Sequence, residues 1–276
     1  MEFPISLFLY AGVSLMNEPV KVLTIAGSDS GGAAGMQADL RAWTVLGAYG
    51  MSVVTVVTAQ NSVAVTAVHP LPPDFVAAQL DAVLTEYGAD GVKTGFIGRT
   101  ALIETIAAKL RQYQLNNSVI DPVLVNPNGQ AMFPTEVTQA YIKHLLPLAD
   151  LITPNQREAE LLTGLPVQSV AEMATAVTHL HALGPKNILL KGGRDGEEIV
   201  DIFYDGDKIT WLRAPYIDTP NTHGSGDTLS AAVCAYLAQG KGMETAVNQA
   251  HQFTYKAIQR AIHWQMGQGH GPVAPL

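Results

Sequence analysis

Short apolar runs that end in polar or glycine-rich turns alternate with helical patterns along most of the chain, and this alternation constrains the fold more than any other feature. Residues 20–26 form a β-branched run, the glycine-rich stretch 27–35 follows, and residues 36–46 have the spacing of an amphipathic helix. Parallel strands need a crossover, usually a helix, between them. The alternation therefore predicts an α/β fold, a three-layer sandwich with a central, mostly parallel sheet between helices.

The same alternation continues as far as residue 190. Residues 51–59 form a Val/Thr-rich run of the kind that is covered on both faces in a parallel sheet. Further strands are predicted at 91–94, 119–123, 151–153 and 187–190, and helices at 74–87, 100–113, 137–148, 175–183, 229–237 and 243–262. Residues 199–204 and 208–212 predict an antiparallel hairpin, which departs from the parallel pattern.

The size and composition of the chain favour one domain. No linker, internal repeat or low-complexity run interrupts residues 16–276, and 47% of the 276 residues are apolar, enough for one large core. Residues 1–15 are expected to be an amino-terminal extension. Their apolar part, 5–13, lacks a basic start and is shorter than the roughly 20 residues of a spanning helix, so we expect no membrane segment.

The charge balance argues against nucleic acid as a partner. The net charge is −8, and no run of Lys or Arg could follow a phosphate backbone. An acidic protein can still bind phosphate through local backbone dipoles and a cation. Cys234 is the only cysteine, so no internal disulfide can form, and a reducing compartment, the cytoplasm, is expected.

The stretch with the clearest chemistry is 221–228, a polar, glycine-punctuated turn that leads into the apolar helix predicted at 229–237. The N–H groups at a helix start have no partner within the helix, and the helix dipole adds roughly half a positive charge there. Gly224 and Gly226 let the backbone approach a phosphate closely. These features predict an anion site.

Asp227 lies inside this positive end, and two interpretations are open. A carboxylate that stays ionised there and faces a substrate hydroxyl can accept its proton as the oxygen attacks phosphorus. Alternatively, Asp227 only caps the helix, because Asp is a common capping residue. The short Gly226-Asp227 motif is compatible with both interpretations.

Further polar side chains fall just after predicted strands or at helix starts: Asp29, Gln60, Asp121, Asn155, Glu158 and Lys191. Ligands of open parallel sheets bind at the carboxyl edge of the strands. Each residue also has a structural alternative, such as a turn residue for Gln60, a partner of the helix dipole for Glu158 and a surface side chain for Lys191. Their common edge predicts a site for phosphate, a cation and a proton acceptor, and phosphoryl transfer to a hydroxyl fits this set best.

The stretch 27–35 matches no standard phosphate or nucleophile motif. It is neither Gly-x-Gly-x-x-Gly nor the Walker lysine loop, and Asp29 stands where a nucleophile elbow needs serine. A flexible turn is one interpretation. Its position after a predicted strand favours the other, a wall of a ligand pocket.

From about residue 22 to residue 273 the chain resembles the ribokinase-like vitamin kinases, and among them the hydroxymethylpyrimidine and phosphomethylpyrimidine kinases of thiamine biosynthesis. The motifs that carry the resemblance follow one another in the family's order. They are Ala26-Gly27-Ser28-Asp29, Gly35-Met36-Gln37-Ala38-Asp39, Ala59-Gln60-Asn61, Asp121-Pro122-Val123, Thr153-Pro154-Asn155 with Glu158-Ala159, Lys191-Gly192-Gly193, residues 221–232 and Gly269-His270-Gly271-Pro272-Val273. The resemblance implies a ribokinase-like fold, ATP and Mg²⁺ as cofactors, a hydroxymethylpyrimidine substrate and a homodimer.

The resemblance also implies roles for single residues. Asp227 would be the catalytic base, beside an anion hole formed by Gly224, Ser225 and Gly226. The remaining assignments are a pyrimidine pocket of Gly27, Asp29, Ala34, Gln60 and Phe96, contacts to ATP and its phosphates from Asp121, Asn155 and Lys191, and a contact to Mg²⁺ from Glu158.

Some positions depart from the family's pattern. Asp227 stands where this group commonly carries cysteine, whereas sugar kinases and many pyridoxal kinases carry aspartate; Phe96 stands where methionine is frequent, and residues 126–129 replace the usual Lys-Ser-Gly. The alternative acceptor is therefore pyridoxal or pyridoxine. A non-catalytic vitamin-binding or regulatory protein is an alternative of another class, against which the presence of Asp227, Glu158 and Lys191 argues.

Overall fold

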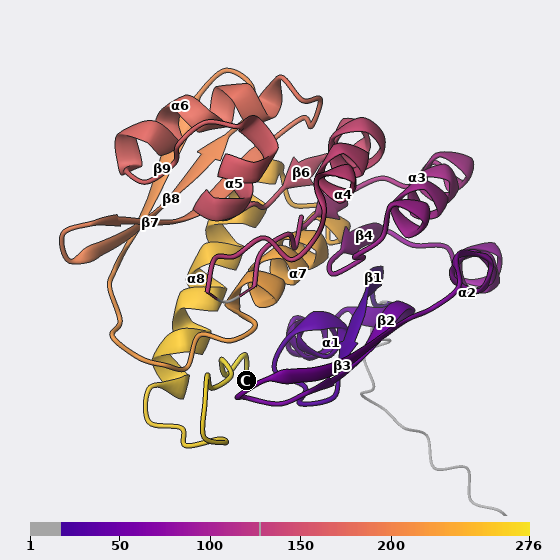
Figure 1. Cartoon of the computed structure of the whole chain (residues 1–276), viewed down its shortest axis with the longest axis horizontal. Helices are drawn as coiled ribbons and strands as arrows, with labels where there is room; N and C mark the ends of the chain where they lie inside the picture. Colours follow the sequence, from indigo (N-terminus) through magenta and orange to yellow (C-terminus); the bar gives the residue numbers. More distant parts are fainter. Residues whose placement is uncertain (1–17, 127) are drawn as a thin grey trace, which may run out of the picture.

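The computed structural model describes residues 18–126 and 128–276 (Figure 1). The extension predicted at 1–15 lies outside the described residues. Among the helices of the described ranges, none is both long enough and apolar enough to cross a membrane.

The described strands form one sheet in the order β3-β2-β1-β4-β5-β6-β7-β8-β9. The parallel strands are β1 (Lys21–Asp29), β2 (Tyr49–Gln60), β4 (Gly91–Thr94), β5 (Ser118–Ile120), β6 (Leu151–Ile152) and β7 (Ile188–Asp195). Antiparallel strands complete both edges: β3 (Val65–Pro70) on one side, β8 (Glu198–Tyr204) and β9 (Ile209–Pro215) on the other. The expected mostly parallel α/β fold and the hairpin are therefore confirmed.

Helices cover both faces of the sheet, which gives the predicted three layers (Figure 1). One face packs on α2 (Pro73–Glu86), α3 (Thr100–Tyr113), α4 (Thr135–Ala140), α5 (Gln156–Thr163) and α6 (Val170–His181). The other face packs on α1 (Gly35–Val45), α7 (Ser225–Ala238) and α8 (Met243–Ala261).

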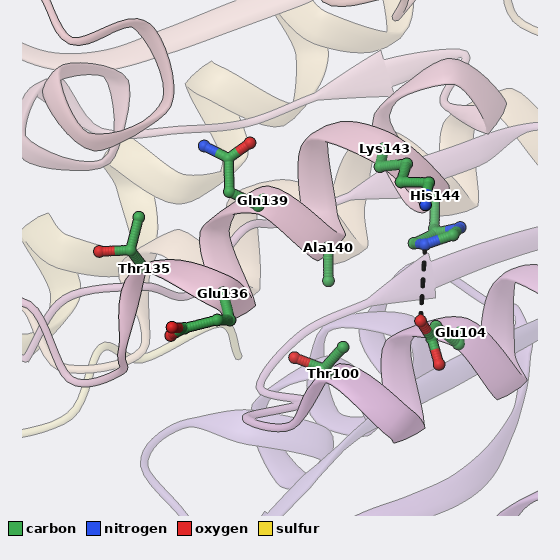
Figure 2. A pocket seen from close by; sticks show the side chains of 8 residues that line it. All are labelled: Thr100, Glu104, Thr135, Glu136, Gln139, Ala140, Lys143 and His144. Atoms are coloured by element: carbon green, nitrogen blue, oxygen red, sulfur yellow. Dashed lines mark ion pairs between the residues drawn. The ribbon is translucent and has the colours of Figure 1, made fainter.

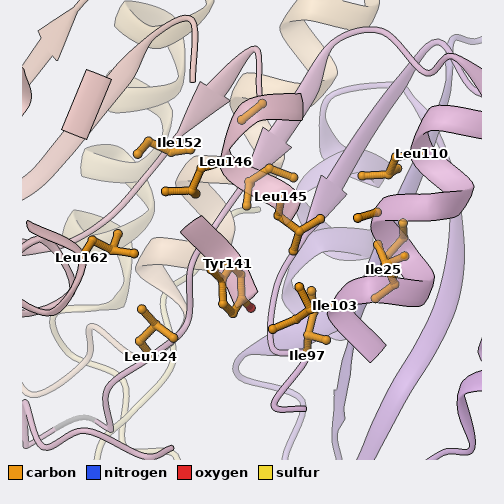
Figure 3. Packing of buried hydrophobic residues seen from close by; sticks show 14 of the residues in the cluster. Ile25, Ile97, Ile103, Leu110, Leu124, Tyr141, Leu145, Leu146, Ile152 and Leu162 are labelled. Carbon is orange, nitrogen blue, oxygen red and sulfur yellow. The ribbon is translucent and has the colours of Figure 1, made fainter. Parts of the chain in front are cut away.

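The alternation of side chains along each strand divides the core between the two faces. On β5, Val119 packs with the α1, α7 and α8 layer, and Ile120 packs with the opposite layer. Leu151 and Ile152 of β6 divide in the same way. Figure 3 shows part of the larger cluster, in which Ile152, Leu162 and Tyr141 lie among buried side chains from several helices.

Some elements differ from the sequence prediction. Strand β3 was not predicted, because nearly all of its side chains are exposed and it lacks an apolar face. Residues 137–148 are not one α-helix: after α4 the chain continues as a π turn, Tyr141–Leu145, and a 3-10 turn, Leu146–Leu148. Pro147 lacks the N–H that a continuous α-helix would use there.

Two further differences affect the site. Strand β7 extends to Asp195, so Lys191 lies within the strand rather than after it, at a register shift between Leu190 and Gly193. Helix α7 begins at Ser225 rather than at residue 229, which places Asp227 in its first turn.

Candidate active site

The stretch 27–35 is organised by Asp29, the last residue of β1. Its Oδ1 accepts the N–H of Gly31 at 2.8 Å, and its Oδ2 accepts the N–H groups of Ala33 and Ala34, both at 2.9 Å. The carboxylate thus fixes a turn whose backbone would otherwise lack partners. Its assignment to substrate binding stays a prediction, because these contacts are all within the loop.

The predicted pyrimidine residues gather beside this loop. A Cβ atom on Gly27 would lie 2.8 Å from Val56 Cγ1 and 3.2 Å from Phe96 Cδ1, so a larger residue would not fit. The ring of Phe96 packs against that of Phe133, with centroids 5.5 Å apart. The N–H of Ala34 is held by Asp29. Gly27 and Phe96 therefore lie side by side, and Ala34 is held by Asp29; their role in binding a pyrimidine stays a prediction.

Gln60 reaches the 221–228 turn through a histidine that the sequence analysis did not assign. Gln60 Nε2 lies 3.2 Å from His223 Nε2, and its Oε1 accepts a hydrogen bond from Thr58 Oγ1 at 3.3 Å. His223 Nε2 also lies 4.0 Å from Asp29 Oδ2. The position of His223 directly before Gly224 was the available signal for it.

The turn 224–227 lies between the 27–35 loop and Lys191. Gly224 has φ +77°, and a Cβ atom there would overlap the carbonyl oxygen of Ala33. A Cβ atom on Gly226 would lie 3.2 Å from Lys191 Nζ. Ser225 is the first residue of α7. Close packing therefore requires glycine at 224, whereas a Cβ at 226 would meet only the end of the flexible Lys191 side chain. The start of α7 lies between the two neighbouring segments, and its Ser225 N–H donates to the carbonyl oxygen of Thr222 at 3.1 Å.

Asp227 does not cap α7. The N-cap residue is Gly224, and no side chain makes a capping hydrogen bond. Instead, Asp227 Oδ1 accepts a hydrogen bond from Lys93 Nζ at 2.9 Å, and 15% of the Asp227 side chain is exposed. The capping alternative therefore lacks the hydrogen bond on which it depends.

Lys93 and its second partner, Asp39, were missed by the sequence analysis. Lys93 lies in β4, has no exposed surface, and also donates to Asp39 Oδ1 at 2.6 Å. A signal was present, because Lys93 falls inside the strand predicted at 91–94, and a lysine in a strand of a covered parallel sheet must be paired.

Asp121 and Lys191 form a second charged pair, which contacts α7 through Ser230. Asp121 Oδ1 accepts hydrogen bonds from Lys191 Nζ at 3.2 Å and from Thr153 Oγ1 at 3.0 Å, while Oδ2 accepts from Ser230 Oγ at 3.2 Å. Burial opposes the charge of Lys191, but the carboxylates of Asp121 and Glu158 more than offset it, so its pKa is raised. Lys191 therefore holds a positive charge at the start of α7.

Asn155 and Glu158 form a capping box at the start of α5. Asn155 Oδ1 accepts the Glu158 N–H at 3.0 Å, Glu158 Oε2 accepts the Asn155 N–H at 2.9 Å, and Glu158 Oε1 accepts the N–H of Leu124 at 3.2 Å. Burial raises the pKa of Glu158 to about 8, and Lys191 acts in the opposite direction. The contacts of Glu158 thus match its interpretation as a residue that stabilises the start of α5. A contact of Glu158 with Mg²⁺ stays a prediction.

Within the described ranges, no group of three or more His, Cys, Asp or Glu side chains could hold a metal by itself. Mg²⁺ binds through one or two carboxylates together with phosphates and waters. Asp121 and Glu158 both raise the pKa of Lys191, and they are the carboxyl groups that could bind such an ion. This donor set fits a magnesium ion that arrives with phosphate.

Two of the cavities on the described surface bear on the location of the site. One, of about 250 Å³, lies between the 27–35 loop and the carboxyl-terminal segment, and its wall includes Asp29, Ala33, His223 and His270. The larger, of about 390 Å³, lies between α3 and α4 and contains the 3.7 Å contact of Glu104 with His144 (Figure 2). Because none of the predicted site residues lines the larger cavity, the smaller one belongs to the candidate site.

Comparisons with known proteins show which family the chain is similar to. Residues 29–274 match the family model described as phosphomethylpyrimidine kinase. A relative in Rhizobium meliloti, named hydroxymethylpyrimidine/phosphomethylpyrimidine kinase, is 44% identical over 253 residues, which cover 91% of this chain and 95% of the relative. The chain spans about half the length of two bifunctional thiamine-biosynthesis relatives, from Arabidopsis thaliana and Geobacter sulfurreducens.

Solved structures of two kinases have the same fold. An ADP complex of Bacillus subtilis pyridoxal kinase is 39% identical, with a TM-score of 0.87 over 93% of this chain and 97% of the other. Phosphomethylpyrimidine kinase from Clostridium difficile is 37% identical, with a TM-score of 0.78 over 87% of this chain and 99% of the other. The fold is therefore shared by kinases with different acceptors in their names.

Proposed function

Because the chain belongs to the phosphomethylpyrimidine kinase family, we propose that it transfers the γ-phosphoryl group of ATP to the hydroxyl of 4-amino-5-hydroxymethyl-2-methylpyrimidine, and then to the phosphate of the monophosphate, in thiamine biosynthesis. The observation that carries the proposal is the turn at the start of α7. It combines a partly exposed carboxylate, Asp227, with backbone donors and with the nearby ammonium of Lys191.

The first phosphorylation follows from these groups. Asp227 accepts the proton of the acceptor hydroxyl while its oxygen forms a bond to the γ-phosphorus and the bond from that phosphorus to ADP breaks. The N–H groups of Gly224 and Gly226, together with that of Ser225 once it leaves the carbonyl oxygen of Thr222, stabilise the charge that develops on the transferring group. Lys191 adds a positive charge on the side of Asp121. These N–H groups and the ammonium of Lys191 thus stabilise the negative charge that the transition state carries on the phosphoryl oxygens.

Asp121, Asn155 and Lys191 are proposed to contact ATP, and Glu158 with Asp121 to hold the ATP-bound magnesium. Magnesium supplies charge neutralisation on the phosphates when bound. Support comes from the pairing of Asp121 with Lys191 and from the position of Glu158 beside them. The similar pyridoxal kinase that binds ADP supports ATP as the donor.

Gln60 is proposed to select the pyrimidine. An amide can donate to a ring nitrogen and accept from an exocyclic amino group, which matches an aminopyrimidine. Support comes from its place at the end of β2 and its contact with His223, next to the turn that carries Asp227. Gly27 lets Val56 and the ring of Phe96 pack directly against the backbone at the end of β1.

Pyridoxal or pyridoxine is the second candidate acceptor. It is favoured by Asp227, which stands where the pyrimidine kinases commonly have cysteine, and by the similarity to Bacillus subtilis pyridoxal kinase. Both candidates require the same transfer to a hydroxymethyl group on a heteroaromatic ring. They differ in which ring the Gln60 side of the site accepts.

An ADP-release assay across four acceptors separates the candidates: hydroxymethylpyrimidine, its monophosphate, pyridoxal and ribose. We expect the highest kcat/KM with the two pyrimidines. A higher kcat/KM with pyridoxal would select the second candidate, and ADP release with none of them, by protein that binds ATP, would support a non-catalytic binding protein.

A homodimer is proposed from the exposed edge of the sheet. Val63, Val65 and Val68 on and beside β3 are 68%, 52% and 50% exposed. An edge strand that exposes valines can pair with another strand, so a second copy is its expected partner. Light scattering after size exclusion measures the mass directly, and a monomer at micromolar concentration would contradict the proposal.

The organisation of residues 16–276 as one domain and a cytoplasmic location are also proposals. One continuous sheet through the described strands supports the first. The lone, buried and unpaired Cys234 supports the second, because a reducing compartment suits a free thiol. Limited proteolysis and localisation of a tagged chain test them.

A further inference from the structure

A chain of hydrogen bonds leads from the interior of the sheet to Asp227. Thr24 Oγ1 on β1 donates to Asp39 Oδ2 on α1 at 2.6 Å. Lys93 Nζ on β4 donates to the other oxygen, Asp39 Oδ1, at 2.6 Å and to Asp227 Oδ1 on α7 at 2.9 Å. Four elements of the fold therefore fix the orientation of one carboxylate.

Burial makes this chain rigid. Neither Lys93 nor Asp39 has exposed side-chain surface, whereas Asp227 is 15% exposed. Burial opposes the charge of Lys93, but Asp227, Asp39 and Asp121 more than offset it and hold its pKa above the ordinary value. Burial raises the pKa of Asp39 to about 7, although Lys93 acts in the opposite direction. The lysine is therefore charged, and it has no route to water.

The two helices that carry the carboxylates are also tied together. Trp43 Nε1 on α1 donates to the carbonyl oxygen of Ala231 on α7 at 2.7 Å, and Trp43 is fully buried. Ala231 lies one helical turn after Asp227. A displacement of Asp227 relative to Asp39 would therefore break buried hydrogen bonds at two places.

The oxygens of Asp227 differ in their surroundings. Oδ1 is held by Lys93, and within the described ranges no hydrogen bond engages Oδ2. A base must present a free lone pair in a fixed direction, and a second group that holds its other atom supplies that direction.

We propose that Lys93, locked by Asp39, is a positioning residue that fixes Asp227 through Oδ1 and so presents Oδ2 to the acceptor hydroxyl. The inference rests on the proposed role of Asp227 as the base.

The test measures kcat, KM for ATP and the melting temperature of Lys93→Met. We expect kcat to fall by about 10²-fold, as for other small displacements of reacting groups, with KM for ATP changed by less than about twofold because the nucleotide contacts are elsewhere. Lys109→Met is a matched control, since it removes a lysine that pairs with Asp81 at 2.6 Å away from the site. Its kcat should stay at the wild-type value.

Removal of Lys93 alone leaves Asp39 buried without its partner and could unfold the protein. Asp39→Asn/Lys93→Met removes both charges and is the second variant. We expect it to melt closer to wild type than Lys93→Met while it keeps the low kcat. Recovery of wild-type kcat together with stability would show that the pair serves the core alone and would overturn the proposal.

A double-mutant cycle with Asp227→Asn separates the proposal from its premise. If Lys93 acts through Asp227, Lys93→Met should lower the residual kcat of Asp227→Asn by less than about threefold, far less than it lowers that of wild type. A loss of equal size in both backgrounds would overturn the positioning role. Near-normal kcat in Asp227→Asn alone would instead overturn the proposed base.

Discussion

The two buried lysines of the site, Lys93 and Lys191, lie in different environments. Lys93 has no exposed side-chain surface and donates to two carboxylates at 2.6 and 2.9 Å. Lys191 is 14% exposed and contacts one carboxylate, Asp121, at 3.2 Å. Short charge-assisted hydrogen bonds are the stronger ones, and an ammonium has three donors. Lys93 is thus committed to the protein, whereas Lys191 keeps donors for a ligand.

The backbone explains the difference. Lys93 lies in β4, between β1 and β5 at the middle of the sheet, where both faces are covered. Lys191 lies at the register shift of β7, next to Gly192 with φ +87°, whose N–H donates to Asp201 Oδ1 at 2.8 Å. A bulge re-aims side chains and opens a strand. The regular strand therefore buries its lysine, and the irregular one presents its lysine to the turn 224–227.

The largest effect is expected for Asp227→Asn, which removes the proton acceptor on which the role of Lys93 depends. Turnover should fall by about 10²- to 10⁴-fold, the usual contribution of general acid–base catalysis. Asparagine Oδ1 can still accept the hydrogen bond of Lys93, and Asp39 still pairs with the Lys93 charge, so the melting temperature should fall only moderately. Steady-state kinetics and thermal melts of the same preparation measure both. Near-normal turnover of Asp227→Asn would refute the assignment of Asp227 as the catalytic base.

Lys191→Met tests the other half of the comparison. It removes a positive charge beside the start of α7, and kcat should fall by about 10²- to 10³-fold, as when one stabilising donor is lost. Lys186→Met is the control, because that lysine pairs with Asp150 at 2.7 Å but is 75% exposed. ADP-release kinetics check the result. If Lys191→Met and Lys186→Met have equal kcat, the ion pair of Lys191 with Asp121 serves only the structure.

Gln60→Leu sharpens the division between the acceptor side and the nucleotide side. Loss of the amide leaves a polar group of the pyrimidine ring without its hydrogen bond, which costs about 1–3 kcal/mol. It should therefore lower kcat/KM for hydroxymethylpyrimidine by about 10- to 100-fold. KM for ATP should stay unchanged, since Gln60 contacts His223 and not the Lys191 pair. Pyrimidine turnover equal to wild type would remove Gln60 from the pocket.

The smallest effect is expected for Glu158→Gln, and it depends on pH. Burial raises the pKa of Glu158 from 4.5 to about 8, so the folded state holds this proton more tightly than the unfolded state. The associated stability is complete below about pH 4.5 and is lost as the pH rises through about 8. Glutamine cannot lose the proton, so the variant should gain stability relative to wild type as the pH rises.

Urea unfolding at the two ends of that pH range measures the difference in the free energy of unfolding. The same variant should need a higher Mg²⁺ concentration for half-maximal turnover, because it offers the ion a neutral ligand. An unchanged Mg²⁺ dependence with the expected pH effect would limit Glu158 to the capping box with Asn155.

Much of the fold was predictable because its determinants are local. Strand β4 and helix α3 have the predicted bounds, and in α3 the helical spacing of Leu, Ile and Ala follows from the residues themselves. Strand β3 was missed because it is held by pairing with β2 rather than by an apolar face. The start of α7 was predicted too late, because Gly224 begins the helix through a left-handed φ that packing against Ala33 requires.

By itself, the sequence determined the α/β class and the phosphate-binding character of the 221–228 turn, and it identified Asp227 as a candidate acceptor, because glycine spacing and a helix start act over a few residues. Only the tertiary structure decided what Asp227 contacts. Lys93 and Asp227 are 134 positions apart, and Lys93 and Asp39 are 54 apart. No local pattern encodes a contact made by the stacking of α1 and α7 on one face of the sheet, so this ion pair arises from packing alone.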